Sequence, residues 1–248
     1  MPSELPEPAP WIGGLPQDER GFYVLSEAGW ENGKPIFSKF SVERTVTLAV
    51  NRGCSLCGYL MPSGRNVYRA FAQGDAAHIR GYERDHAYDP SGPLHLSCIL
   101  YSTIVCPYLR EKTARLGKDS MVNPGARRGS LAAVMGFKNY GLMLGVNPPR
   151  GVQPLPKIGY MGLDEDIRYR DGDELRDRYA EAVLSDQTFI DINQPRMFWT
   201  DSASDKAALN RAMIEASQSV RENETVWGPI RIADGGPESA VPFVTKAV

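Results

Sequence analysis

The chain has four cysteines and three histidines, and all seven lie between Cys54 and Cys106. That window spans 53 of the 248 residues. Thiolates and imidazoles are the ligands that Zn²⁺ prefers in proteins. In a chain whose first residues do not resemble a secretory leader, such clustering favours a metal site over disulfides.

The first pair of candidate ligands is Cys54 and Cys57, a CxxC followed by Gly58. This pattern is typical of a zinc knuckle, a tight turn that directs two thiolates at one ion. Glycine at the exit allows the positive φ that such a turn requires.

The second pair is His95 and Cys98, which follow Gly92 and Pro93. Glycine as the N-cap and proline as the first residue predict that a helix begins here. Residues three apart lie on one helix face, so both side chains can reach the same ion. Three thiolates and one imidazole predict a closed, tetrahedral, structural zinc site, with no position left for a catalytic water. The predicted ligands are Cys54, Cys57, His95 and Cys98.

Two alternatives use the same residues without a metal: a free dithiol beside two core residues, or a thioredoxin-like redox pair. The redox motif belongs at the start of a helix in a βαβ unit, which the pattern around Cys54 does not indicate. Cys106 lies eight residues after Cys98, about 12 Å further along a helix, and is interpreted as a core thiol.

Asp85 and His86 suggest a different chemistry, because an Asp-His pair ahead of a zinc-binding helix is typical of HNH nucleases. In that hypothesis both residues are catalytic and a second ion such as Mg²⁺ assists hydrolysis. The simpler interpretation places His78 and His86 in solvated loops.

A basic stretch follows, with six cations against two acids over residues 110–128. It is interpreted either as a solvated connector or as a surface that contacts phosphate or an acidic partner. It lacks the regular aromatic interleaving of a single-strand-binding platform. The candidate contacts are Arg110, Lys112, Arg115, Lys118, Arg127 and Arg128.

The elements that position these residues predict an α+β protein. The predicted fold is a treble-clef-like zinc module of knuckle, hairpin and buried helix, followed by a small β-hairpin plus helices. The predicted parts are a Pro-rich flexible arm (1–10), the zinc module (11–110), a basic connector (111–130) and an α+β C-terminal region (131–248). The predicted strands are 45–50, 66–72, 131–137, 141–146, 157–161 and 226–232. The predicted C-terminal helices are 173–185 and 204–221, with Ser204 as the N-cap of the second.

Composition excludes several classes of protein. The formal net charge is −2 and 23% of residues are charged, which disfavours a protein that coats nucleic acid over its whole surface. No apolar run approaches the roughly 18 residues of a membrane span. The sequence contains no GxGxxG, Walker, GxSxG or HExxH motif, so no nucleotide cofactor is predicted. We expect a cytoplasmic protein.

The chain resembles largely uncharacterised bacterial and bacteriophage proteins. These share a PWI-type start, an RGF or RGY turn, CxxCG, and a helix of pattern HxxC followed by CP and an aromatic residue. The matching segments here are Trp11-Ile12, Arg20-Gly21-Phe22, Cys54 to Gly58, Gly92 to Cys98, Tyr101 and Cys106 to Leu109. The resemblance covers about residues 10–110 and implies a zinc site and a phage or mobile-element origin.

Together these features predict a zinc-stabilised binding protein with a macromolecular partner, either protein or nucleic acid. Two alternatives stay open: the treble-clef or HNH-like nuclease, and a structural subunit of a phage or host assembly.

Overall fold

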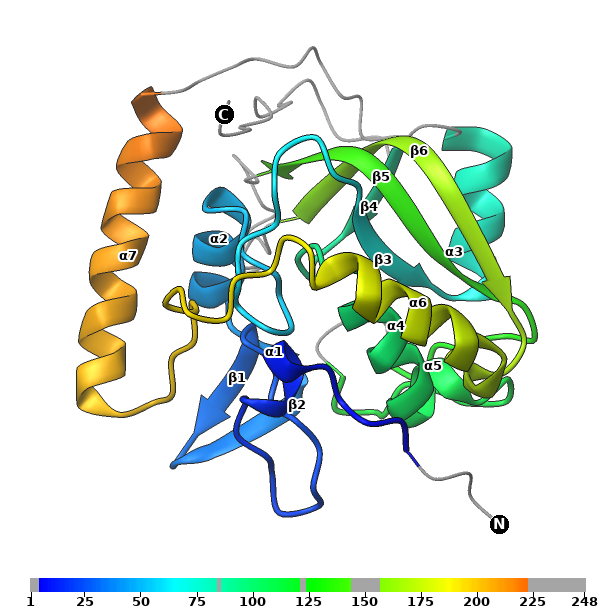
Figure 1. Ribbon diagram of the computed structural model, residues 1–248, viewed down its shortest axis with the longest axis horizontal. Helices are drawn as coiled ribbons and strands as arrows, with labels where there is room; N and C mark the ends of the chain where they lie inside the picture. Colours follow the sequence, from blue (N-terminus) through cyan, green and yellow to red (C-terminus); the bar gives the residue numbers. More distant parts are fainter. Residues whose placement is uncertain (1–4, 84–85, 121–123, 144–156, 223–248) are drawn as a thin grey trace.

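The computed structural model describes residues 5–83, 86–120, 124–143 and 157–222. Within them the chain is a mixed α+β protein whose largest sheet has four antiparallel strands in the order β3-β5-β6-β4 (Figure 1). The strands are β3 (Val67–Phe71), β4 (His86–Asp89), β5 (Ala132–Met143) and β6 (Lys157–Tyr169). Strands from the predicted zinc module therefore share one sheet with strands of the predicted C-terminal region.

The hairpin predicted over 131–146 is wrong, because its first strand and its turn belong to the single strand β5. Residues 138–140, predicted as its turn, continue the strand, which pairs with β6 from Ala132 opposite Tyr169 to Met143 opposite Lys157. The triplet Lys138-Asn139-Tyr140 contains neither Gly nor Pro to force a reversal. The hydroxyl of Tyr140 is buried and donates to Ala49 O at 2.8 Å, which fixes this part of the strand against the core.

The predicted strand over 66–72 exists as β3, but its partner is β5. The hairpin expected between the two ligand pairs is therefore not present in the described residues. Instead the chain continues through α3 (Gln73–His78) and a π-helical turn (Ile79–Glu83) to β4 on the other edge of the sheet.

Helices cover one face of the sheet (Figure 1). The central helix, α4, packs against β3 and against α6. These helices are α4 (Leu96–Val105), α5 (Pro107–Arg110) and α6 (Arg176–Asp186), the last preceded by a 3₁₀ turn (Gly172–Leu175). Asp171 caps that turn by accepting from the amide of Asp173, so the helix predicted over 173–185 is confirmed.

Residues 45–50, predicted as a strand, form most of helix α2 (Val42–Val50). The β-branched residues of this segment favoured a strand, but Ser41 accepts from the amide of Arg44 and caps a helix. Helix α2 packs between β5 and the long helix α7 (Ala203–Glu222). Tertiary burial therefore outweighs the local strand preference.

A separate two-stranded sheet is formed by β1 (Ala28–Glu31) and β2 (Lys34–Phe40). Its turn contains Asn32 and Gly33, both with positive φ, as a two-residue hairpin requires. The chain before it holds the short helix α1 (Pro10–Gly13). Ala9, in the predicted flexible arm, is buried and its amide donates to the Tyr179 hydroxyl at 2.8 Å.

The strand predicted over 226–232 lies outside the described residues. Among the helices that the structure describes, none combines the length and the apolar composition needed to cross a membrane.

Candidate metal centre

The four predicted ligands come together in the folded protein. The ligand atoms of Cys54, Cys57, His95 and Cys98 all lie within 4.8 Å of one another, and all four residues are buried. His95 Nδ1 lies 3.5 Å from Cys57 Sγ and 3.9 Å from Cys98 Sγ. In a tetrahedral zinc site with Zn–S of about 2.3 Å and Zn–N of about 2.0 Å, ligand atoms are about 3.5–3.8 Å apart. The cluster therefore fits a metal ion such as zinc.

The first two ligands lie on a tight knuckle. The amide of Gly58 donates to Cys54 O at 2.8 Å, and the amide of Cys54 donates to Tyr59 O at 2.9 Å. Gly58 has a φ of +74°, as its position at the exit of a knuckle predicts. A side chain there would also collide with the carbonyl oxygen of Met197.

The second pair lies at the start of α4, but the helix begins later than predicted. Its first residue is Leu96, so His95 is the N-cap and Cys98 lies in the first turn. Gly92 and Pro93 lie outside the helix and form hydrogen bonds with other segments. The Gly92 amide donates to the Glu27 carboxylate, and Pro93 O accepts from the Ser55 amide. The ligands still converge because the N-cap and the third helical residue face the same side of the turn.

The imidazole of His95 is oriented by its second nitrogen. Nε2 lies 3.1 Å from Leu60 O, so its N–H donates to that carbonyl and Nδ1 is left to face the three sulfurs. This outer hydrogen bond is the kind that fixes the tautomer of metal-binding histidines. Leu60 follows the knuckle directly, so the knuckle itself sets the orientation of the third ligand.

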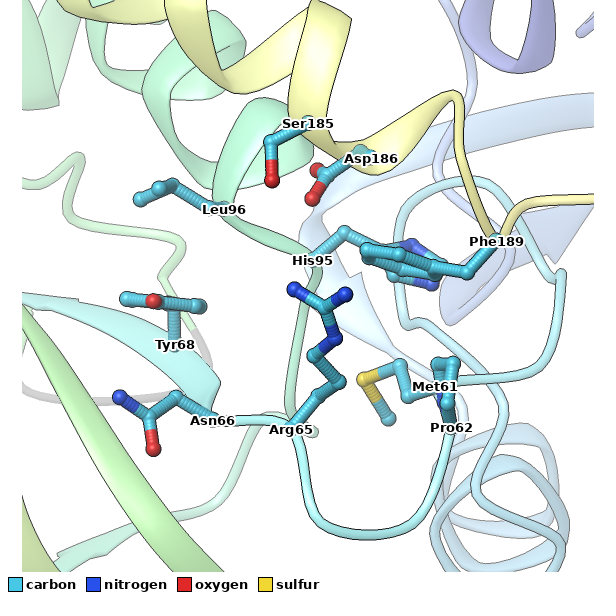
Figure 2. Close-up of a pocket in the computed structure, with 10 residues that line it drawn as sticks. All are labelled: Met61, Pro62, Arg65, Asn66, Tyr68, His95, Leu96, Ser185, Asp186 and Phe189. Atoms are coloured by element: carbon cyan, nitrogen blue, oxygen red, sulfur yellow. The ribbon is translucent and has the colours of Figure 1, made fainter.

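Two side chains cover the outer edge of His95 (Figure 2). The Phe189 ring lies 6.0 Å from the imidazole, centroid to centroid, and Arg65 stacks on Phe189 at 4.8 Å. The pocket that remains here has a volume of about 60 Å³, room for little more than water. This cover leaves no space for a substrate beside the cluster.

Asp186 of α6 supports the same helix end. Its carboxylate accepts from the amide of Ser97 at 2.8 Å and so caps α4, whose N-cap His95 makes no capping bond through its own side chain. Burial raises the pKa of Asp186, against the lowering effect of the Ser97 hydrogen bonds. The Ser97 hydroxyl accepts from the Trp11 indole at 3.2 Å.

The four groups of the cluster shift one another's pKa strongly. Burial alone raises the pKa of Cys54, but hydrogen bonds from Cys57 and Cys98, together with His95, hold the Cys54 pKa well below its usual range. Burial lowers the pKa of His95, but the adjacent Cys54 and Cys57 raise that pKa well above its ordinary value. Burial also raises the pKa of Cys57 and of Cys98, so the charges that the four groups carry by themselves are a Cys54 thiolate and a protonated His95 that offset each other.

Cys106 is not part of the cluster, as predicted. It is the C-cap of α4, at the far end of the helix from Cys98. Burial of its thiol raises the pKa of Cys106.

The structure does not test the proposed nuclease residues. Asp85 lies outside the described residues, and His86 is the first residue of β4, opposite Met161. His78 ends α3 and is exposed, close enough to Asp75 to interact electrostatically. His78 is not among the four residues of the Cys54 cluster, and the nuclease stays a hypothesis.

The six basic candidates do not form one surface. Arg128 is fully buried, and its guanidinium donates to Leu109 O, Gly129 O and Arg170 O, so its place is structural and not at a partner surface. Arg110 forms an ion pair with Asp173 at 2.7 Å. The other four are exposed: Lys112, Arg115, Lys118 and Arg127.

The structure also contains a large cleft that the sequence did not reveal. Its volume is about 960 Å³, at the upper end for ligand pockets. Its lining includes three ionisable residues absent from the predicted site, Glu27, Arg69 and Asp89. They are far apart in sequence and share no motif, so no spacing could have marked them.

Comparisons with models of protein families, with curated proteins and with solved structures found no match to this chain.

Proposed function

We propose that this protein is a zinc-stabilised binding protein, in which a non-catalytic zinc ion organises a cleft that receives a macromolecular partner. The observation that carries the proposal is the group of four buried side chains, as many ligands as a tetrahedral zinc shell requires. The arrangement is treble-clef-like in that a knuckle supplies two ligands and the start of a helix supplies two more.

The knuckle connects the ion to the cleft. Ser55 O accepts from the Glu27 amide at 3.1 Å, and Leu56 O accepts from the Ser26 amide at 3.0 Å. The Ser55 amide donates to Pro93 O at 2.9 Å. Glu27, Leu56 and Leu94 all line the cleft. Zinc bound between Cys54 and Cys57 would therefore fix the backbone that forms one side of the binding site.

Buried zinc would act here as part of the folding free energy, because such ligands come together only in the folded chain. The chain's own residues would bind and orient the partner. The pocket beside His95 supports this division of roles, since its volume of about 60 Å³ holds little more than water.

The first test is metal content of the untagged protein by mass spectrometry, with thermal melts before and after chelation. We expect one zinc per chain and a melt that collapses on chelation. Metal-free protein with an unchanged melt would contradict the structural-zinc proposal.

The second test places a photocrosslinker in the cleft as Phe37→p-benzoylphenylalanine, with Ile214→p-benzoylphenylalanine on α7 as the control. Both residues are exposed, and only Phe37 lines the cleft. We expect adducts with a macromolecule from lysate at position 37 and none at position 214. No adduct at either position would contradict the binding role.

A further inference from the structure

Asn32 and Gly33 form the turn of the β1–β2 sheet, and this pair of residues is chemically reactive as well as structural. Asn32 is the one asparagine of the chain that a glycine follows. In such a pair the glycine nitrogen can attack the side-chain amide of the asparagine, because glycine has no side chain to hinder the approach. Asparagine is accordingly one of the labile residues of proteins. The turn is therefore a candidate for spontaneous deamidation.

Solvent reaches both residues of the turn. Asn32 and Gly33 are exposed, and a side chain added at Gly33 would meet no atom within 4 Å. Within the part of the chain that the structure describes, the side-chain amide of Asn32 has no hydrogen-bond partner. Space is thus available for a succinimide ring to form and for water to reach it.

The main-chain amide of Gly33 has a partner from a distant part of the sequence. The strand pairing places Glu31 opposite Lys34, so the two turn residues between them lie outside the ladder. The Gly33 amide donates instead to Asp201 Oδ2 at 2.8 Å, across 168 residues of sequence. This amide nitrogen is the atom that must attack Asn32 if the turn is to deamidate.

The Asp201 carboxylate opposes that attack in two ways. The Gly33 nitrogen has to give up its hydrogen bond to the carboxylate before it can form a bond to carbon. Loss of the amide proton would also place a negative nitrogen beside a negative carboxylate, which Coulomb repulsion disfavours. An apolar side chain at position 201 would exert neither effect.

The segment that carries this carboxylate is anchored beside the sheet. Arg44 of α2 donates to Trp199 O at 3.2 Å and to Thr200 O at 2.8 Å. The Trp30 ring of β1 lies edge-on to the Phe198 ring, with the ring centroids 6.4 Å apart. These contacts hold the carboxylate next to the turn without the help of the turn itself.

Asp171 and Gly172 provide an internal comparison, because an aspartate followed by glycine can form the same ring with loss of water. Gly172 is buried, and a side chain there would collide with the carbonyl oxygen of Thr103. The Asp171 carboxylate accepts from the Asp173 amide at 3.0 Å. The close packing leaves the main chain no space to rearrange, so we expect this pair to be inert.

We propose that Asn32 is a modification site, at which the chain deamidates spontaneously to aspartate and isoaspartate at a rate that the Asp201 carboxylate limits. The Gly33 nitrogen forms a bond to Asn32 Cγ as its proton passes to solvent, and the Cγ–Nδ2 bond breaks as ammonia leaves. Water then opens the succinimide at either of its two carbonyl carbons, which gives aspartate or isoaspartate. The reaction consumes only water and does not depend on the zinc site.

Both products change the turn. Each adds a carboxylate next to Gly33, whose amide faces Asp201, so two like charges share the tip of the sheet. Isoaspartate also adds a carbon atom to the main chain and lengthens a turn whose length sets the strand register. The contact between the sheet and the segment before α7 should then be lost.

The test follows the full, zinc-loaded chain during incubation at mildly alkaline pH, by peptide mass spectrometry and an isoaspartate-specific methylation assay. We expect deamidation at Asn32 to exceed that at Asn66 and Asn193, and we expect no isoaspartate at position 171. Deamidation at Asn32 no faster than at the other two asparagines would overturn the proposal.

A matched pair of variants tests the role of the carboxylate. Asp201→Ala removes the acceptor of the Gly33 amide, whereas Glu19→Ala removes a carboxylate that reaches the same turn through Lys34 Nζ at 2.6 Å. We expect Asp201→Ala to deamidate about threefold faster than the native protein, a factor typical of an exposed contact to a charged group. Glu19→Ala should keep the native rate. An unchanged or slower rate in Asp201→Ala would overturn the role of Asp201, as would equal acceleration in both variants.

Urea separates a local effect from a change in overall stability. In the unfolded chain the Gly33–Asp201 hydrogen bond is absent, so the native protein and Asp201→Ala should deamidate at one common rate, faster than that of the folded native protein. A difference that persists in urea would overturn the assignment to this hydrogen bond. Asp201→Asn keeps an acceptor oxygen without the charge and should give a rate between those of the native protein and Asp201→Ala.

Discussion

His95 Nδ1 lies 3.5 Å from the sulfur of Cys57, although 38 residues separate the two in sequence. One comes from the N-cap of α4 and the other from the knuckle. The contact is made possible by the second nitrogen of His95, which is held by the carbonyl of Leu60 three residues after Cys57. The knuckle therefore both supplies ligands and orients the imidazole that completes the set.

The ligand set predicts different outcomes for two cysteines at opposite ends of one helix. Cys98→Ser should abolish zinc binding and unfold the protein at ordinary temperature, because metal affinity is folding free energy at such a site. Cys106→Ser should keep one zinc per chain and lower the melting temperature only modestly. Metal analysis beside circular dichroism melts would check this, and equal effects would disprove the ligand assignment.

Replacement of the imidazole gives a second test of the same cluster. His95→Cys should retain zinc, since four thiolates also form a closed tetrahedral site, whereas His95→Ala should lose it. We expect the cysteine variant to be less stable than the native protein because the hydrogen bond to Leu60 O is lost. Co²⁺ substitution followed by absorption spectroscopy would report the change of donor set. Retention of metal by His95→Ala would contradict the assignment.

Gly58 can be compared with Gly64, because both have nearly the same positive φ. Their φ values are +74° and +75°, but a side chain at Gly58 would meet Met197 O, and one at Gly64 would meet nothing within 4 Å. Gly64→Ala should cost about 1 kcal/mol of unfolding free energy from backbone strain alone. Gly58→Ala should cost at least twice as much and weaken zinc binding. Chemical denaturation of the two variants would measure the difference, and similar costs would show that the approach of Met197 is unimportant.

Replacing each of two adjacent arginines by alanine should change the unfolding free energy by very different amounts. Arg128→Ala removes a fully buried guanidinium that serves three carbonyl groups and lies 4.5 Å from the Tyr169 ring centre. The orphaned carbonyls and the cavity should cost about 3 kcal/mol or more. Arg127→Ala, at an exposed position, should change stability by less than about 0.5 kcal/mol. Urea denaturation checks both, and comparable costs would contradict this separation of roles.

The unfolding free energy is predicted to depend on pH because of Glu27. Burial is the main cause that raises its pKa, from 4.5 to about 7, against the lowering effects of Arg69 and the Gly92 amide. The folded state then binds a proton that the unfolded state has released, so unfolding free energy should fall as pH rises from about 4.5 to about 7. The full effect is on the order of 3 kcal/mol.

The measurement is the difference in unfolding free energy between the native protein and Glu27→Gln across that range. A difference between variants removes the contribution of zinc release, which itself depends on pH. Exposed Glu31→Gln serves as the control. A native pH profile identical to that of Glu27→Gln would show that Glu27 titrates as it does in the unfolded chain.

The sequence predicted which four side chains form the Cys54 cluster, and the surrounding fold only in part. Cys54, Cys57, His95 and Cys98 could be identified because the spacing within each pair directly reflects a turn or a helix. Helix α2 was mistaken for a strand because Thr45, Val46 and Thr47 favour strands locally, whereas packing against α7 decides the outcome.

The cleft could not be predicted at all. Glu27, Arg69 and Asp89 become neighbours only when the β1–β2 sheet is tied to the knuckle and β4 joins the far edge of the main sheet. Such proximity depends on the topology of the fold, which the local hydrophobic periodicity of the sequence does not reveal. The basic stretch was recognised as charged, but only the fold separates buried Arg128 from exposed Arg115 and Arg127.

The strand order β3-β5-β6-β4 also has a consequence for synthesis on the ribosome. The outer strands are made first, and the two inner strands follow only when residues 132–169 have been translated. At about 5–20 residues per second, several seconds pass in which the outer strands lack their neighbours. All four metal ligands have left the ribosome before the inner strands do. Early capture of zinc would hold the knuckle to the start of α4 during that interval and shield the nascent chain from aggregation.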